Sequence, residues 1–202
     1  MMKYVLLFGL VFPHLSKGQS TVIGLGNYRI GITTPDSLNR TGFKEEDPSY
    51  VKGTIALPCI HIRTFTSAIV KIAGIAVTNV VLVFYDNKLF KLSCDYSGLL
   101  EPVFLEQHGP GVRKPVSRFQ VCTKEKHKLL LMWGEVWPGV DMLALVVHRK
   151  GYMADCKPEE GARLVIADQR ISALSSECDV KPTDPLIEEF IKAQTNKPGT
   201  QR

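Results

Sequence analysis

The chain has 202 residues, of which 45% are hydrophobic and 22% charged, and its formal net charge is +5. These proportions are those of ordinary globular proteins, so they exclude a largely disordered chain and a polytopic membrane protein. A chain of this length forms one domain or at most two small ones, and it needs no metal or disulfide merely to fold.

The first 18 residues have the layout of an export signal. Lys3 gives a basic start, residues 4–12 are apolar, and the small residues Ser16 and Gly18 precede a possible cleavage point. The apolar run is shorter than the roughly 20 residues that span a bilayer. We therefore predict a signal peptide over residues 1–18 and a secreted or periplasmic protein, the alternative being a buried N-terminal strand.

The beginning of the mature chain predicts a short strand followed by a short helix. The strand ends at Ile32, and Thr34 can cap a helix whose first residue is Pro35, where the missing N–H breaks no hydrogen bond. Gly42 is a natural stop for this two-turn helix. Asn39 opens an Asn-Arg-Thr glycosylation sequon, which matters only in a eukaryotic host.

Residues 67–85 are mostly apolar but predict strands rather than a membrane span. Lys71 lies inside the run, and a charge in mid-membrane costs about 2.5 to 3.5 kcal/mol. Ile and Val dominate, and β-branched side chains pack well on a pleated sheet. We predict two strands with a break near Gly74 or at Thr78-Asn79.

A tight hairpin turn is predicted at Asp86-Asn87, because both residue types tolerate positive φ. It joins a strand over residues 80–85 to one over residues 89–94. The alternation in the second strand predicts one wet face and one buried face, the latter formed by Phe90, Leu92 and Cys94.

The rest of the chain predicts one helix and then a run of strands. The helix covers residues 99–107, has an apolar stripe and ends at Gly109-Pro110-Gly111. Strands are predicted at residues 118–123, 129–136, 142–149 and 162–167. This order indicates an α+β fold, mainly an antiparallel β-sheet with two or three short helices.

We expect a single α+β domain over residues 19–175, followed at 176–202 by an amphipathic helix and a disordered tail. The helix starts at Pro185, with Leu186 and Phe190 on its apolar face. It either docks on its own domain or covers a groove on a partner.

All five cysteines lie in the predicted mature chain, at Cys59, Cys94, Cys122, Cys156 and Cys178. In an oxidising compartment they can form two disulfides and leave one thiol, and fifteen such arrangements exist because any of five residues can be left over. We favour Cys156–Cys178, since these residues flank the last predicted strand. The alternative is that several cysteines are small buried hydrophobic residues.

Three segments carry a resemblance to a known group of proteins: residues 28–33 before a helix, residues 84–89 on a hairpin, and the helix stop at residues 108–111. In this order they resemble small bacterial envelope proteins of the outer-membrane small-lipoprotein and β-lactamase-inhibitor-protein-like type. The resemblance implies a helix-plus-sheet fold and a role in binding other proteins. The chain departs from it by lacking a lipoprotein cysteine, and no functional residue is carried over.

Signatures of common enzymes are absent from the sequence. It contains no GxSxG, no HExxH, no Walker A motif and no complete dinucleotide fingerprint, so we predict no cofactor. Cys59 and His61 share one face of a strand and could bind a metal ion together with His127 or His148. A cysteine nucleophile with a histidine base is the other enzymatic interpretation, using Cys59, or using Cys122 with His148 and Asp141.

Basic residues gather in two groups, one at residues 113–118 and one at residues 124–128. Neither is interleaved with aromatic residues, and removal of the signal lowers the net charge from +5 to +3 because Lys3 and Lys17 are lost. We therefore read both groups as solvated loops and predict no nucleic-acid partner.

Trp133, Trp137 and Tyr152 are candidate binding residues, because Trp and Tyr dominate binding hot spots. Pro138-Gly139 would present Trp137 at a loop tip. The alternative is a sheet covered on both faces, since large apolar residues flank Trp133 on either face of its strand.

The sequence as a whole favours an exported, non-enzymatic protein that binds a protein or an envelope component through Trp133, Trp137 and Tyr152. The alternative function is a secreted thiol- or metal-dependent enzyme that uses Cys59 and His61.

Overall fold

The computed structural model describes residues 22–39, 42–54, 56–180, 187 and 190–191. The predicted signal peptide and most of the predicted C-terminal tail therefore lie outside the described residues.

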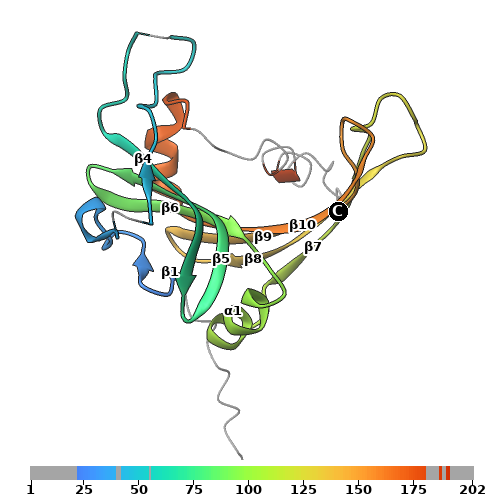
Figure 1. Cartoon of the computed structure of the whole chain (residues 1–202), viewed down its shortest axis with the longest axis horizontal. Helices are drawn as coiled ribbons and strands as arrows, with labels where there is room; N and C mark the ends of the chain where they lie inside the picture. The colour runs from blue at the N-terminus through green and yellow to red at the C-terminus, as the bar shows by residue number, and fades with distance from the viewer. Residues whose placement is uncertain (1–21, 40–41, 55, 181–186, 188–189, 192–202) are drawn as a thin grey trace, which may run out of the picture.

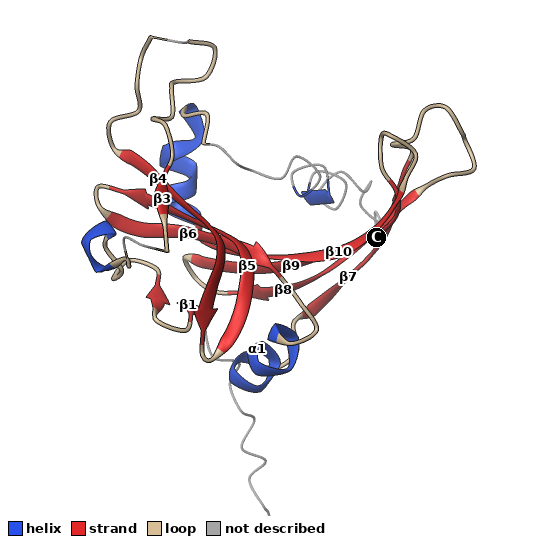
Figure 2. Cartoon of the chain, in the orientation of Figure 1, coloured by secondary structure: helices blue, strands red, loops and turns tan. Residues whose placement is uncertain are grey.

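An eight-stranded antiparallel sheet dominates the structure (Figures 1 and 2). In spatial order the strands are β3 (Lys44–Glu45), β4 (Ile62–Ile72), β5 (Ile75–Tyr85), β6 (Lys88–Asp95), β10 (Pro158–Asp168), β9 (Met142–Tyr152), β8 (Leu130–Pro138) and β7 (Val112–Phe119). Two very short strands, β1 (Gly24–Leu25) and β2 (Tyr28–Arg29), pair separately. The α+β prediction with a mainly antiparallel sheet is confirmed.

The connection from β6 to β7 determines the topology. After β6 the chain forms α1 (Leu100–His108), crosses to the far edge of the sheet as β7, and returns through β8 and β9 until β10 pairs with β6. Two further short elements follow, α2 (Gln169–Leu174) and η2 (Ser175–Glu177). The predicted helix at residues 99–107 is thus confirmed, and Gly109 ends it with a φ of 69°.

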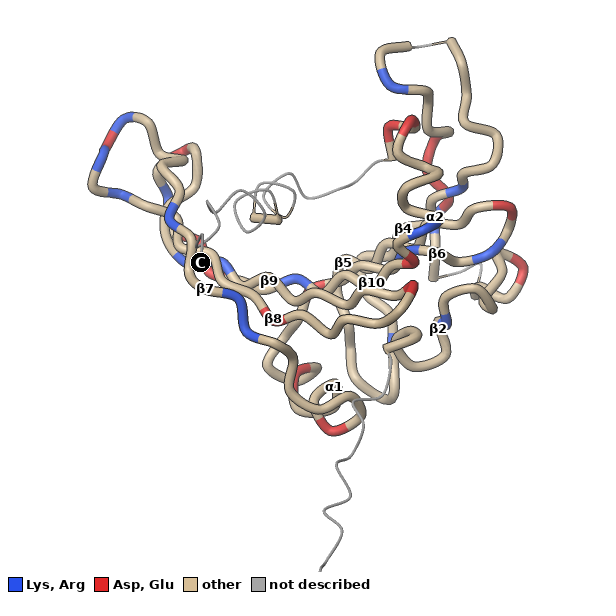
Figure 3. The backbone as a smooth tube through the Cα atoms, turned by 180° about the vertical axis from the view of Figure 1, so that it is seen from behind, with Lys and Arg blue, Asp and Glu red and all other residues tan. Residues whose placement is uncertain are grey.

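The sheet is bent, and both of its faces are covered (Figures 1 and 3). On one face the largest core cluster joins α1 and the N-terminal segment to the sheet, with Phe104, Leu92 and Leu164 completely buried. On the other face, Ile171 of α2 packs against a cluster that contains Val83 and Phe90. Both faces of the sheet are therefore covered in part, whereas Trp133 on β8 is only half-buried.

Local turn chemistry explains the hairpins. Asp86 and Asn87 have φ of 46° and 60°, which confirms the predicted turn between β5 and β6. The break between β4 and β5 falls at Ala73-Gly74, where Gly74 has a φ of 81°, and not at Thr78-Asn79.

Three predictions about single elements are wrong. The predicted wet face of β6 is only partly exposed: Ser93 is 5% exposed, while Lys91 and Asp95 are intermediate. The predicted buried face is also wrong, because a register shift between Val83 and Phe84 places Phe90 in a different cluster from Leu92. The helix after Thr34 is only one 3₁₀ turn, η1 (Pro35–Ser37).

The third error is the strand predicted at residues 118–123, since β7 runs over Val112–Phe119. In the sequence, the presence of Pro115 disfavours a strand at these residues. It is tolerated here because β7 is at the sheet edge, where a strand need not donate all its N–H groups.

Two described residues of the C-terminal segment are buried against the sheet. Ile187 and Phe190 are 6% and 1% exposed and form a cluster with Leu130, Met132 and Val147. A Cβ atom at Gly134 would lie 3.0 Å from the Phe190 ring, so this glycine makes room for it. At these residues the C-terminal segment docks on its own domain.

Candidate functional site

The clearest functional candidate is an aromatic pair on the outer half of the sheet. Trp133 of β8 and His148 of β9 are directly opposite each other in the strand register. Their rings are parallel within 3°, with 5.3 Å between the centroids. Both residues are half-buried, so the pair is held by the sheet and still reaches the surface.

Charged and aromatic groups surround this pair. Tyr96, which follows β6, packs edge-on against His148 with 6.2 Å between centroids, and it also packs against Phe104 of α1. Burial lowers the pKa of His148, while the carboxylates of Glu101 and Glu135 act in the opposite direction. Burial also raises the pKa of Tyr96. His148 is therefore a neutral, flat surface for contact at pH 7.

Trp137 does not belong to this surface, and the prediction of an exposed Trp137 is wrong. It is 3% exposed, packs edge-on against Phe104 at 5.1 Å, and donates a 2.9 Å hydrogen bond from Nε1 to the carbonyl oxygen of Gly109. The ring also lies so close to Gly111 that a Cβ atom there would approach within 2.9 Å. Trp137 shares a strand face with Trp133, but α1 covers only the Trp137 end.

Tyr152 lies at the far end of β9 on the same face as His148, because residues four apart on a strand point the same way. It is half-buried, and the ammonium of Lys128 lies 5.0 Å from its ring centroid. Leu131 and Lys150, a cross-strand pair, lie between Tyr152 and Trp133. We call Leu131, Trp133, His148, Lys150 and Tyr152 the Trp133 surface.

The cysteine pairing differs from the predicted one. Cys59 is bonded to Cys178 and Cys122 to Cys156, while Cys94 is free and buried. The predicted Cys156–Cys178 bond is wrong because the two residues end up at opposite ends of β10. Cys156 lies in the turn before that strand, and Cys178 follows the helical segment after it.

The proposed metal pair of Cys59 and His61 is also wrong, because the Cys59 sulfur is in a disulfide and supplies no thiolate. His61 is exposed, with its Nδ1 atom 2.6 Å from Asp86 Oδ1 and its ring stacked on Tyr85. Within the described ranges, no group of three or more His, Cys, Asp or Glu side chains is arranged to bind a metal ion.

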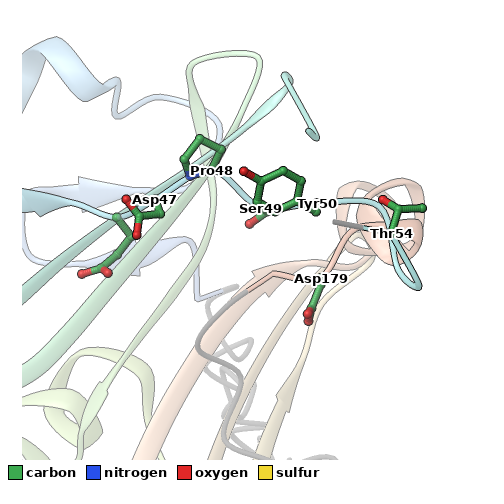
Figure 4. Close-up of a pocket in the computed structure, with 7 residues that line it drawn as sticks. Asp47, Pro48, Ser49, Tyr50, Thr54 and Asp179 are labelled. Carbon is green, nitrogen blue, oxygen red and sulfur yellow. The ribbon is translucent and has the colours of Figure 1, made fainter. Parts of the chain in front are cut away.

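A pocket of about 530 Å³ lies next to the Cys59–Cys178 disulfide. Figure 4 shows that most of its lining follows one loop, while Asp179 comes from the C-terminal segment. The lining residues are Glu46, Asp47, Pro48, Ser49, Tyr50, Thr54 and Asp179. The amide of Asp179 donates to the Tyr50 carbonyl at 2.7 Å, so the disulfide and this bond hold the two segments together.

The sequence points to Trp133 and Tyr152, but it suggests His148 only as a metal ligand or a catalytic base and not as the partner of Trp133. The signal that could have found it is the strand register, since His148 pairs with Trp133 once β8 and β9 form a hairpin. Such pairing depends on turn length, and the predicted strands leave a five-residue connection at residues 137–141, whereas the structure has three residues, 139–141, between β8 and β9.

Comparison with protein-family models, with curated proteins and with solved structures finds no match for this chain. The resemblance to small bacterial envelope proteins stays a prediction. Across the described part of the chain, no helix has the length and apolar character of a membrane span.

Proposed function

We propose that this chain is an exported, non-enzymatic protein that binds a protein or an envelope component through the Trp133 surface. The observation that carries the proposal is the parallel stack of Trp133 on His148, which presents a large ring on a rigid sheet. Trp and Tyr at such positions supply much of the energy of protein interfaces.

Preorganisation supports the proposal. A side chain that is already fixed in the free protein loses little conformational entropy on binding. The Trp133 ring is held by its stack on the His148 ring, and the His148 ring in turn packs against Tyr96. The surface is therefore ready for a partner without rearrangement.

Two disulfides support export, because such bonds form and persist mainly outside the reducing cytosol. They also remove the nucleophiles of the thiol-enzyme alternative, since Cys59 and Cys122 are both bonded. The remaining thiol, Cys94, is completely buried, and burial raises its pKa to about 12. A thiol of this kind is a poor nucleophile.

Affinity capture with matched variants tests this function. The protein without residues 1–18 is immobilised and exposed to secreted and envelope fractions of its host, and bound proteins are quantified by mass spectrometry. Trp133→Ala is compared with Ile69→Ala, which removes an exposed side chain on distant β4. We expect Trp133→Ala to reduce one defined partner by about fivefold or more, equivalent to about 1 kcal/mol, and Ile69→Ala to retain it. Equal capture by both variants would contradict the proposal.

A further inference from the structure

The excess of positive over negative charge in this protein arises in one segment. Residues 112–128 contain six Lys and Arg side chains and one carboxylate, whereas the rest of the chain contains nineteen of each sign. The net charge of +5 is therefore that of this segment alone. We call its six cations the basic edge, namely Arg113, Lys114, Arg118, Lys124, Lys126 and Lys128.

The fold places the basic edge along one border of the molecule. Three of its cations are on β7, the outermost strand of the sheet, and three are in the loop that leads to β8. Figure 3 shows these basic positions along β7 and in the loop beyond it. The eight residues of β7 extend over about 26 Å, and the Cys122–Cys156 disulfide ties the loop to the neighbouring β9–β10 turn.

Most of this charge is not neutralised by the protein itself. Lys114, Arg118, Lys124 and Lys126 make no ion pair among the described residues, and Arg113 is 88% exposed with a loose 3.5 Å contact to Glu135. Lys128 is the cation of the edge with a close partner, the carboxylate of Glu125 at 2.8 Å. Asp155, next to the Cys122–Cys156 disulfide, pairs with Lys157.

The edge is not built for the addition of a further strand. Pro115 lacks an N–H donor, and the register between β7 and β8 shifts between Lys114 and Ser117. Proline, irregular register and charged side chains are the devices that prevent edge-to-edge pairing. Recognition at this edge must therefore use the side-chain charges and not the backbone.

The chemistry of the loop narrows the class of partner. Residues 123–128 contain no aliphatic side chain and no Phe, Tyr or Trp, so they have nothing to insert into a bilayer. His127 is their single aromatic ring, which is short of the series of aromatic side chains on which successive bases stack. The cations are spread along a strand and the loop that continues it. They therefore form a line and not a flat patch. A linear chain of anionic groups fits such a line better than a flat membrane does.

We propose that the basic edge binds a linear polyanion, specifically a sulfated or carboxylated polysaccharide. This activity goes beyond the proposed function, since it uses different residues from the Trp133 surface. Because the contacts are exposed ion pairs, binding weakens as salt concentration rises.

Heparin serves as the probe, with two triple variants that each lower the net charge by three. Arg118→Gln/Lys124→Gln/Lys126→Gln removes charge from the basic edge, and Lys44→Gln/Lys52→Gln/Lys71→Gln removes exposed cations elsewhere. Dissociation constants are measured by calorimetry at 0.05 and about 0.15 M salt, where the Debye length is about 8 Å. We expect the first variant to bind about tenfold or more weakly and the second to bind like the unmodified protein.

Three results would overturn the proposal: no heparin binding by the unmodified protein, equal loss in both triple variants, or tighter binding to phosphatidylserine vesicles or duplex DNA than to heparin. Circular dichroism verifies that each variant is folded. Trp133→Ala separates this proposal from the proposed function, because it should lose the captured protein partner and retain heparin binding.

Discussion

Trp133 on β8 lies parallel to His148 on β9, with 5.3 Å between their ring centroids, while Trp137 on the same face of β8 is buried beneath α1. Cross-strand pairs of this kind contribute about 0.2–1 kcal/mol to sheet stability. The two tryptophans therefore have different roles, and substitutions can separate them.

Trp137→Ala should reduce the free energy of unfolding by about 3–5 kcal/mol, because it empties a core site and leaves the Gly109 carbonyl without its donor. Trp133→Ala should reduce the free energy of unfolding by only about 1 kcal/mol, since the ring is half-exposed. Urea unfolding followed by circular dichroism measures both. A loss at Trp133 as large as that at Trp137 would show that Trp133 belongs to the core.

Stability should depend on pH through His108 and His148, because burial lowers the pKa of both imidazoles. In the unfolded chain each has its ordinary pKa of 6.5, so the unfolded state takes up protons first as pH falls. Stability is therefore constant above about pH 6.5 and decreases below it.

Unfolding free energies at pH 7.5, 6.5 and 5.5 test this dependence. His148→Gln should show a smaller decrease between pH 6.5 and 5.5 than the unmodified protein. The matched control is His127→Gln, which changes an imidazole with 79% of its side chain exposed. A pH dependence unaltered by His148→Gln would contradict the assignment.

Peptide mapping without reduction should find Cys59–Cys178 and Cys122–Cys156, and no Cys156–Cys178. Cys94 should resist alkylation in the folded protein and react after denaturation, because it is completely buried. The two bonds close loops with sequence separations of 119 and 34, and chain entropy gives contributions of about 5 and about 4 kcal/mol. Paired Cys→Ser variants measure these contributions, and a thiol at Cys94 that reacts in the folded state would contradict its placement.

Elements encoded by neighbouring residues could be predicted from the sequence. The turn at Asp86-Asn87 and the end of α1 at Gly109 depend on local φ preferences, so both are confirmed. The β7 strand could not be located, because Pro115 is acceptable only at a sheet edge, and the edge position follows from the return of β10 to β6.

The candidate site could be predicted only in part, because its arrangement also depends on contacts between residues distant in the sequence. The predicted strand ends at residue 136 and leaves Trp137 at a loop tip, whereas β8 extends to Pro138 and puts Trp137 on the face of Trp133. Which of the two rings is covered depends on where α1 packs. The disulfide partners of Cys59 and Cys122 are distant in sequence, so spacing carries no information about them.

Site-specific photo-crosslinking tests the binding role of the Trp133 surface most directly. A photoreactive benzoylphenylalanine replaces Lys150, an exposed residue of that surface, or Ile69 on β4 as the control, and each protein is irradiated in the secreted and envelope fractions of the host. We predict one defined protein adduct at position 150 that is absent at position 69 and reduced about fivefold by Trp133→Ala. Equal adducts at both positions, or none at position 150, would contradict a binding role for this surface.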